Sequence, residues 1–287
     1  MVQAVSSYKL EEAAVTPRAK PRSNWGAWLG RRSLGWLLPV ALLGLWTLIT
    51  EKGWAPPQLL PAPRLVLDTI IDLAKSGELL TNYAISLARV TAGFFVGAVL
   101  GALIGTGMGL SRRFEQYVYP LFNALSQVPV LGWLPLAMMV FGIGEELKIV
   151  IIAQASLVPV AINVLSGIRR VPVQYLEVAR VFEYSRGQLL RRVLFPATVP
   201  SLFVGIRYGL TLAWLSLVTV ELLASSEGLG FLIVWGRQLF QLDLVLAAII
   251  SVGVVGLLLD KGLAALESRL LRWRQEANFG TNQARVS

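Results

Sequence analysis

Apolar residues gather in long blocks along the chain, and short charged segments separate the blocks. An α-helix needs roughly 20 consecutive apolar residues to cross a hydrocarbon core of about 30 Å. The pattern predicts six membrane-spanning helices, at about Leu34–Thr50, Ala84–Leu110, Val118–Phe141, Leu147–Ile168, Val199–Leu223 and Leu244–Leu266. We therefore expect an all-α membrane protein whose core domain covers residues 84–266.

The segments outside this core are more polar. Residues 1–33 have no periodic pattern, which predicts a cytoplasmic tail that ends in a short interfacial helix around Trp25 and Trp28. Residues 34–83 hold the first span and a proline-punctuated amphipathic stretch, which suits a helix lying in the membrane interface. Residues 267–287 are predicted to form a second cytoplasmic tail.

The placement of positive charge predicts an orientation. The net charge is +9, and most of the 26 lysines and arginines fall in residues 1–33, in the turn after the second span, in residues 169–197 and near the C-terminal end. These regions share one side of the membrane if six spans alternate. Cytoplasmic loops carry the excess of lysine and arginine, so both termini are predicted to be cytoplasmic. Because the basic residues flank apolar blocks, we expect no nucleic-acid partner.

The composition limits the chemistry of the chain. It has no cysteine, which excludes disulfides and thiolate metal sites, and no histidine, the commonest metal ligand and general base. The phosphate-loop pattern G-x-x-x-x-G-K-[ST] does not occur either. We therefore expect a transport subunit rather than an enzyme, with no catalytic, metal-binding or cofactor-binding residues of its own.

The predicted second span carries a glycine every fourth residue: Gly93, Gly97, Gly101, Gly105 and Gly109. At about 100° per residue, these positions form one nearly continuous ridge along a helix face. Small residues allow helix backbones to approach closely in lipid. The ridge therefore indicates either tight packing within one subunit or a surface that slides against a neighbour during transport.

Residues 169–197 are too charged to cross a membrane and predict a helical hairpin. Pro172 is placed to start one short amphipathic helix, and a second helix is expected at about Arg186–Val193, closed by Pro196. The exposed apolar face of such a hairpin requires a partner. The alternative is a surface helix that Arg186, Arg191 and Arg192 anchor to lipid headgroups.

The hairpin sequence EVARVFEYSRGQLLRRVLFP resembles the cytoplasmic motif of a known family. The family consists of the inner-membrane permeases of ABC importers of the sulfonate, taurine and nitrate type, whose motif is Glu-Ala-Ala, then Gly, then Ile-x-Leu-Pro. Glu177, Ala179 and Pro196 match the motif in type and spacing. Glu183 replaces the family's glycine, so we expect the turn to be shifted toward Gly187. The resemblance extends over roughly residues 36–275 and is strongest to the aliphatic sulfonate permeases.

The resemblance implies a type I ABC importer permease fold in the inner (cytoplasmic) membrane. It also implies a homodimer, two cytoplasmic ATPase subunits that hold ATP and Mg, and an extracytoplasmic solute-binding protein. The cargo would be a small anionic solute, most simply an aliphatic sulfonate, with nitrate, taurine and bicarbonate as alternatives. The first hairpin helix would be the coupling helix that docks on the ATPase, through Tyr175, Leu176, Glu177, Ala179, Arg180, Glu183, Gly187 and Pro196.

Polar residues in the predicted fifth span are candidates for the translocation pathway. Arg207, Thr211, Trp214 and Glu221 lie toward a similar helix face, with Arg207 and Glu221 about 21 Å apart along the axis. Alternatively, Arg207 only reaches the cytoplasmic headgroups, and Glu221 only pairs with Arg237 or a neighbour.

Two other functional classes fit a polytopic membrane chain. An ion-gradient-driven secondary transporter commonly contains internal repeats and ionisable relays at mid-membrane depth. A membrane scaffold or receptor would not need a helical hairpin with its distal proline. We see no convincing internal repeat, and the hairpin favours the importer permease.

Overall fold

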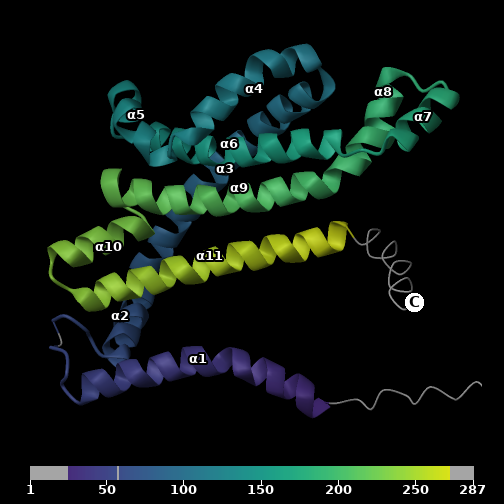
Figure 1. Ribbon diagram of the computed structural model, residues 1–287. Helices are drawn as coiled ribbons and strands as arrows, with labels where there is room; N and C mark the ends of the chain where they lie inside the picture. Colours follow the sequence, from purple (N-terminus) through teal and green to yellow (C-terminus); the bar gives the residue numbers. More distant parts are fainter. Residues whose placement is uncertain (1–24, 57, 272–287) are drawn as a thin grey trace, which may run out of the picture.

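The computed structural model describes residues 25–56 and 58–271, and these form helices and connecting turns without a strand. Figure 1 shows the long helices side by side in a bundle, with a hairpin protruding from one end. The elements are α1 (Trp25–Glu51), α2 (Pro63–Lys75), α3 (Glu78–Leu110), α4 (Arg112–Gln127), η1 (Val130–Trp133), α5 (Leu134–Phe141), α6 (Glu145–Arg169), α7 (Val173–Val181), α8 (Arg186–Leu189), η2 (Leu190–Leu194), α9 (Phe195–Ala224), α10 (Leu229–Gln238) and α11 (Leu242–Leu270).

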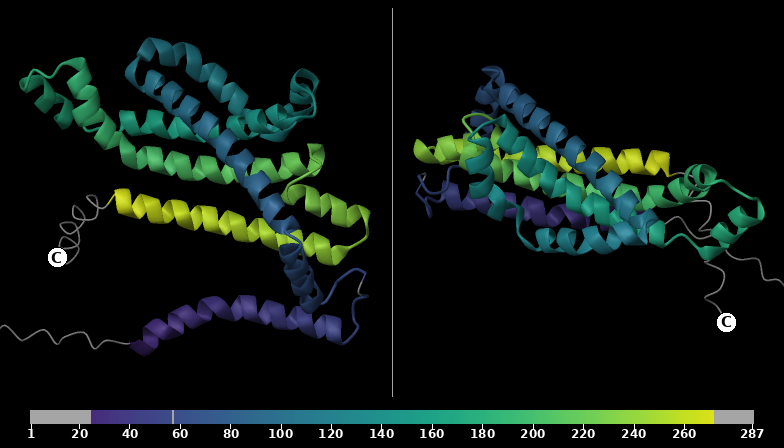
Figure 2. Two further views of the ribbon diagram at one scale, coloured as in Figure 1. Left: turned by 180° about the vertical axis from the view of Figure 1, so that it is seen from behind. Right: turned by 90° about the horizontal axis from the view of Figure 1, so that it is seen from above.

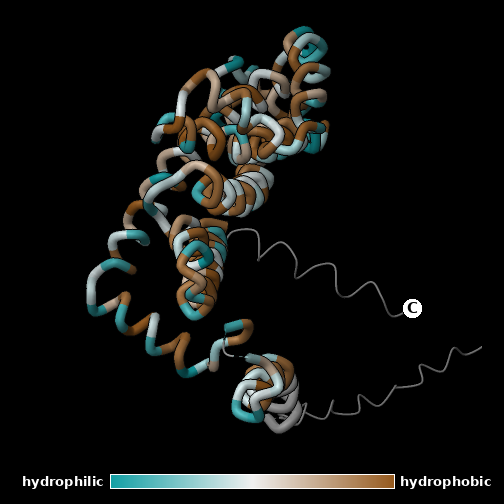
Figure 3. Tube along the Cα trace, turned by 90° about the vertical axis from the view of Figure 1, so that its left-hand side faces the viewer, coloured by the Kyte–Doolittle hydropathy of each residue, from teal (hydrophilic) through white to brown (hydrophobic). Residues whose placement is uncertain are grey.

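Within the described residues, four helical segments are long and apolar enough to cross a membrane: Glu78–Leu110, Glu145–Arg169, Arg186–Gln238 and Leu242–Leu270. They coincide with the predicted second, fourth, fifth and sixth spans. Phe95, Leu103 and Leu258 on α3 and α11 are more than 60% exposed in the single chain, as is expected of helices that face lipid. Figure 3 shows hydrophobic residues predominating along the bundle.

The predicted third span is wrong as a continuous helix. The chain bends by 93° between α4 and the segment Val130–Phe141, so the pair is either a broken span or a re-entrant loop. Pro129 provides the physical reason, because a proline disfavours the helical conformation of the residue before it. Val128 is accordingly extended, with φ −85° and ψ 118°. Among the residues that the structure describes, four helical segments are therefore long and apolar enough to cross a membrane, or five if the bent pair is one span.

The first helix begins earlier than predicted, at Trp25, inside the stretch expected to be a tail. Residues 1–24 and 272–287, on which most of the two predicted tails fall, lie outside the described residues. The part of α1 whose side chains the structure describes contains an apolar helical segment, Leu37–Glu51. Figures 1 and 2 show α1 apart from the main bundle and connected to it through α2. The Trp46 indole N–H of α1 donates to the carbonyl of Pro61, just before α2, at 3.1 Å.

The glycine ridge on α3 packs against α6 of the same subunit. A Cβ added at Gly93 would lie 2.6 Å from the Cβ of Ile152, and one added at Gly101 would lie 2.5 Å from the Leu157 carbonyl oxygen. Neither position can accept a side chain unless a helix moves. The interpretation as tight packing within one subunit is confirmed, and the helix that the glycines meet is α6.

Candidate functional site

The segment 169–197 forms the predicted hairpin, with α7 and α8 as its two arms (Figure 1). Pro172 directly precedes α7, as predicted. After α7, the Tyr184 N–H donates to the Ala179 carbonyl at 2.9 Å, and the Glu183 N–H donates to the Arg180 carbonyl at 2.9 Å. Helix ends of this kind place one residue in the left-handed region. That residue is Glu183, with φ +51°.

The predicted shift of this turn toward Gly187 is wrong. Glu183 keeps the position of the family's glycine and adopts the left-handed conformation, which costs about 1–2 kcal/mol for a residue with a Cβ. Gly187 lies inside α8. That helix starts at a capping box, in which Ser185 and Gln188 each accept from the backbone N–H of the other. The capping box fixes the start of α8 and leaves the turn at Glu183.

The predicted end of the second arm at Pro196 is also wrong. The helical path continues from Arg186 through η2 into α9, which ends at Ala224, and Pro196 lies in the first turn of α9. The wider π-helical turn η2 ends at Leu194, two residues before the proline. A proline has no N–H to donate, and a local π-bulge is one way in which a helix accommodates such a site. The hairpin is therefore joined to α9 by continuous helix.

The predicted coupling residues divide between the lining of a cavity and the outer surface of the hairpin. Ala179, at 3% exposure, lines a cavity of about 510 Å³ between α7 and the start of α9, together with the more exposed Tyr175 and Pro196. Leu176 is half-buried, whereas Tyr175, Glu177, Arg180, Glu183, Gly187 and Pro196 are exposed. The exposed side also carries a group of large apolar side chains that the sequence analysis did not single out as a set. These are Val173, Val181 and Phe182, between 65% and 80% exposed, whereas Val178 is 53% exposed and also lines the cavity.

Three of the four predicted pathway residues, Arg207, Thr211 and Trp214, lie between α9 and α11. Arg207 donates from Nε and one terminal nitrogen to the two carboxylate oxygens of Asp260, at 2.8 and 3.0 Å. Arg207, Thr211 and Trp214 line a cavity of about 280 Å³ against α11. The indole packs against Gly256, where an added Cβ would lie 2.9 Å from its Nε1. Asp260 is a partner that the sequence analysis missed.

Glu221 does not join these three residues. Its carboxylate is 1% exposed and accepts from the Ser86 hydroxyl at 2.8 Å, the Arg89 guanidinium at 3.0 Å and the Gly230 N–H at 2.9 Å. The expected alternative of a pair with Arg237 is replaced by the pair with Arg89. Glu221 therefore holds α3, α9 and the start of α10 together.

A larger cluster surrounds this pair at the end of α9 farthest from the hairpin. Arg89 also binds both carboxylate oxygens of Glu145, at 2.8 and 2.6 Å, and Lys148 donates to Glu145 at 2.7 Å. We call Ser86, Arg89, Glu145, Lys148 and Glu221 the ionic cluster. It joins α3, α6 and α9, and its arginine also donates to the Glu227 carbonyl at 2.8 Å. An arginine and a glutamate, each inside a predicted span, were the signal that could have indicated it.

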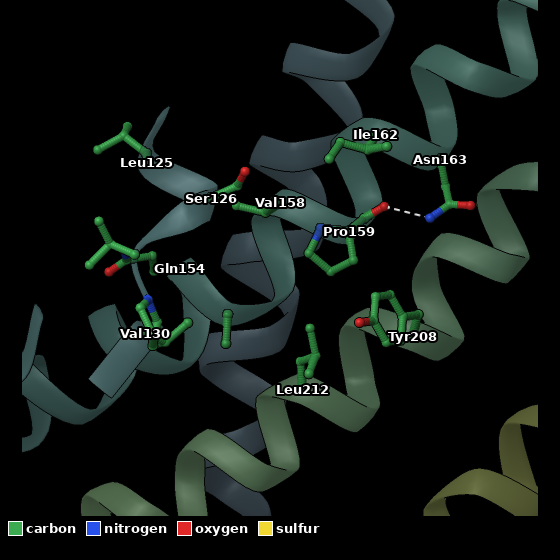
Figure 4. Close-up of a pocket in the computed structure, with 13 residues that line it drawn as sticks. Leu125, Ser126, Val130, Gln154, Val158, Pro159, Ile162, Asn163, Tyr208 and Leu212 are labelled. Atoms are coloured by element: carbon green, nitrogen blue, oxygen red, sulfur yellow. Dashed lines mark hydrogen bonds between the residues drawn. The ribbon is translucent and has the colours of Figure 1, made fainter. Parts of the chain in front are cut away.

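A third cavity, of about 290 Å³, is lined by Tyr208 and Leu212 of α9 rather than by Arg207 and Thr211 (Figure 4). The break between α4 and η1, the middle of α6 and the middle of α9 form its walls. Its polar side chains are all uncharged: Ser126, Gln154, Asn163 and Tyr208. Neither this cavity nor any other part of residues 25–56 and 58–271 groups three acidic or histidine side chains that could hold a metal ion.

Comparisons with known proteins all lead to membrane components of transport systems. Residues 93–272 match the family described as "Binding-protein-dependent transport system inner membrane component". The chain is 41% identical to a Bacillus subtilis protein named for aliphatic sulfonates transport, the permease SsuC, over 85% of this chain and 90% of that one. It is 34% identical to the taurine transport system permease TauC of Escherichia coli, over 89% and 95%. An inward-facing structure of the MetNI methionine ABC transporter aligns with a TM-score of 0.57 at 19% identity, over 68% of this chain and 94% of that one.

Proposed function

The chain belongs to the family of binding-protein-dependent transport system inner membrane components, and from this membership we propose how it couples ATP hydrolysis to the import of an organic anion. It is a permease subunit of an ABC importer, an integral inner-membrane protein and a transport component rather than an enzyme. The ion-gradient transporter and the membrane scaffold are thereby set aside. The proposal concerns the partners, the orientation and the cargo.

The hairpin is the proposed docking site for a separate cytoplasmic ATPase, which would hold ATP and Mg. The observation that carries this assignment is the group of exposed apolar side chains on a hairpin that protrudes from the bundle. Val181 and Phe182 are 80% and 69% exposed. Exposed apolar groups of this kind at a protruding element mark interaction surfaces. Since the chain contains no phosphate loop, the energy for transport has to enter through a contact with another chain.

The proposed coupling route is the helix itself. Because the path from α8 through η2 into α9 is continuous, a displacement of the hairpin by the ATPase moves α9 as a rigid body. The buried Ala179 lies between α7 and the start of α9, so a displacement of α7 would be passed on to α9. On this proposal, Tyr175, Glu177 and Arg180 meet the ATPase, whereas Ala179 keeps the hairpin in shape.

The proposed orientation places the hairpin and both termini in the cytoplasm. The start of α1, the end of α11 and the hairpin lie at the same end of the bundle in all views (Figures 1 and 2). That end carries Arg169, Arg186, Arg191 and Arg192, and cytoplasmic segments are rich in arginine and lysine. The ionic cluster then lies at the extracytoplasmic end, where a solute-binding protein would deliver the cargo.

The proposed cargo is an aliphatic sulfonate, and the proposed assembly is a twofold dimer of permeases with two ATPase subunits. The sulfonate assignment rests on the relative named for that substrate, and the relatives named for taurine and nitrate give the alternatives. A passage role for the face with Arg207, Thr211 and Trp214 stays a prediction. The bidentate pair with Asp260 supplies a countercharge to Arg207, which weakens its attraction for an anion.

The test is uptake of radiolabelled butanesulfonate into proteoliposomes that contain the permease and its ATPase, with the solute-binding protein outside and ATP inside. We expect uptake that requires ATP and persists when proton and sodium gradients are collapsed. Phe182→Asp should abolish uptake and ATPase copurification, because a carboxylate would be buried in an apolar contact. Leu59→Asp, at an equally exposed leucine outside the hairpin, is the matched control and should retain both. Uptake driven by an ion gradient without ATP would refute the proposal.

A further inference from the structure

The cavity between α4, α6 and α9 contains polar side chains that neither the packing of the helices nor the proposed coupling to an ATPase explains. It lies at the middle of the long helices: Gln154 is about 13 Å along α6 from Glu145, in a helix of 25 residues, and Tyr208 lies near the middle of α9. Uncharged polar side chains from three elements line it, Ser126 from α4, Gln154 and Asn163 from α6, and Tyr208 from α9 (Figure 4).

The broken helix indicates what fills this space. Val128 and Pro129 are the non-helical residues at the 93° bend, and both line the cavity. Irregular backbone at membrane depth is tolerated where protein buries it or where it lines a water-filled cavity, because lipid cannot satisfy its polar groups. Discontinuous helices form substrate sites in other membrane transporters for the same reason. The bend therefore indicates an aqueous space rather than a lipid-facing groove.

The hydrogen-bonding groups of the lining are available to a ligand. Pro159 has no N–H, so the carbonyl of Ala155, also in the lining, lacks its regular helical donor. Asn163 uses its amide to donate to the Pro159 carbonyl at 2.8 Å. Within the part of the chain that the structure describes, the side chains of Gln154 and Tyr208 have no hydrogen-bond partner. Their N–H and O–H donors face a cavity that contains no charged side chain.

We propose that this cavity is a substrate site for a short alkyl chain with an oxoanion head, whose oxygens accept hydrogen bonds from Gln154 and Tyr208. This inference rests on the proposed function and specifies its substrate class. The apolar part of the lining, Leu125, Val130, Val158, Ile162 and Leu212, would bury an alkyl chain and offers nothing to an inorganic anion such as nitrate. A volume of about 290 Å³ is at the lower end of ligand pockets, which span roughly 300–1,000 Å³.

The lining contains no charged side chain, which suits transient binding during transport better than tight binding. A translocation site must bind its cargo well enough to admit it and weakly enough to release it. Neutral donors provide hydrogen bonds to an oxoanion without the strong attraction of an unpaired arginine. The high-affinity step then belongs to the binding protein, and the permease holds the solute only in passing.

The test uses the absence of native cysteine. Ser126→Cys and Leu212→Cys, at lining positions that leave Gln154 and Tyr208 in place, are introduced singly into the permease, assembled with its ATPase, and treated with the sulfonate-bearing reagent 2-sulfonatoethyl methanethiosulfonate. Both cysteines should react, and butanesulfonate at about four times its dissociation constant should slow labelling about fivefold, because the bound solute blocks the thiol. Equimolar nitrate should leave the rate unchanged. Phe95→Cys, on a highly exposed apolar position of α3, is the control and should remain unlabelled.

Each other outcome overturns the inference in a distinct way. Unreactive cysteines at both positions would mean that lipid or a second copy of the chain fills the cavity. Reaction without protection by butanesulfonate would leave only a water-filled space, and equal protection by nitrate would remove the role of the apolar wall. Labelling does not require transport, so these results are separate from ATP-driven uptake by the parent permease, whose absence would instead refute the proposed function.

Discussion

The two ends of α9 differ in how firmly they are held. At one end, Glu221 is buried and bonded to α3 and α10, and through Arg89 to α6. At the other, Phe195 is 61% exposed and the chain continues into a hairpin whose apolar side chains are uncovered. A helix that is fixed at one end and free at the other can act as a lever. The ionic cluster is therefore suited to be the pivot of this lever, and the hairpin is suited to receive the force.

Breaking the ionic cluster should lower the free energy of unfolding more than any other change considered below. Arg89→Leu leaves the Glu221 carboxylate buried without its cation, and removing one partner of a buried pair costs about 3–5 kcal/mol. We expect the free energy of unfolding in detergent to fall by that amount, measured by thermal or denaturant unfolding. The double variant Arg89→Leu/Glu221→Leu should recover part of the loss, since no lone charge remains buried.

The exposed pair on the same helix provides the control for that experiment. Arg207→Leu breaks a bidentate pair with Asp260, but both side chains are nearly half exposed, and exposed pairs contribute little. Its effect on unfolding should be much smaller than that of Arg89→Leu. Equal losses for the two variants would contradict the distinction between a fixed and a free region of α9.

Filling the glycine seam should have the next largest effect. Gly101→Leu inserts a side chain where even a Cβ would lie 2.5 Å from the Leu157 carbonyl oxygen of α6. Overpacking of this kind costs about 1–3 kcal/mol, which unfolding in detergent would detect. Gly253→Leu on α11 is the matched control, because nothing lies within 4 Å of its added Cβ. A stable Gly101→Leu protein would show that α3 and α6 can separate.

The smallest expected effect concerns the turn of the hairpin. Glu183→Gly should remove the cost of a left-handed residue with a Cβ, about 1 kcal/mol, and slow amide exchange of residues 177–190 about fivefold. Hydrogen exchange measured by mass spectrometry checks this. Glu183→Ala removes the carboxylate and keeps the Cβ, so it should give no protection. Equal protection by both variants would mean that the charge of Glu183, not its backbone conformation, limits the hairpin.

Local patterns predicted much of this architecture from the sequence. Apolar blocks located α3, α6, α9 and α11, and the spacing of four residues between glycines identified the seam, because both signals are periodic along one helix. The hairpin and its relation to the family were evident from Glu177, Ala179 and Pro196, and the comparisons confirm the family and the fold.

The predictions failed at two kinds of feature: contacts between residues that are far apart in the sequence, and prolines whose effect depends on how tightly the surrounding helix is packed. Arg89 and Glu221 are 132 positions apart, and no periodic pattern connects them. Pro159 and Pro129 look alike in the sequence, yet α6 tolerates the first and the chain bends at the second. The tight packing of α6 on α3 and α9 keeps α6 helical, whereas α4 buries only Phe122 and has less to oppose the bend.

The hairpin is proposed to transmit the force of a separate ATPase into α9. A cross-link tests this role, because the chain has no cysteine and single cysteines can be introduced. Val181→Cys, with a short thiol-reactive photo-crosslinker in membranes that contain the assembled transporter, should join the permease to the ATPase subunit. Leu59→Cys should not. A cross-link from position 59 as strong as that from position 181, or none from position 181 in a complex that transports, would contradict the account.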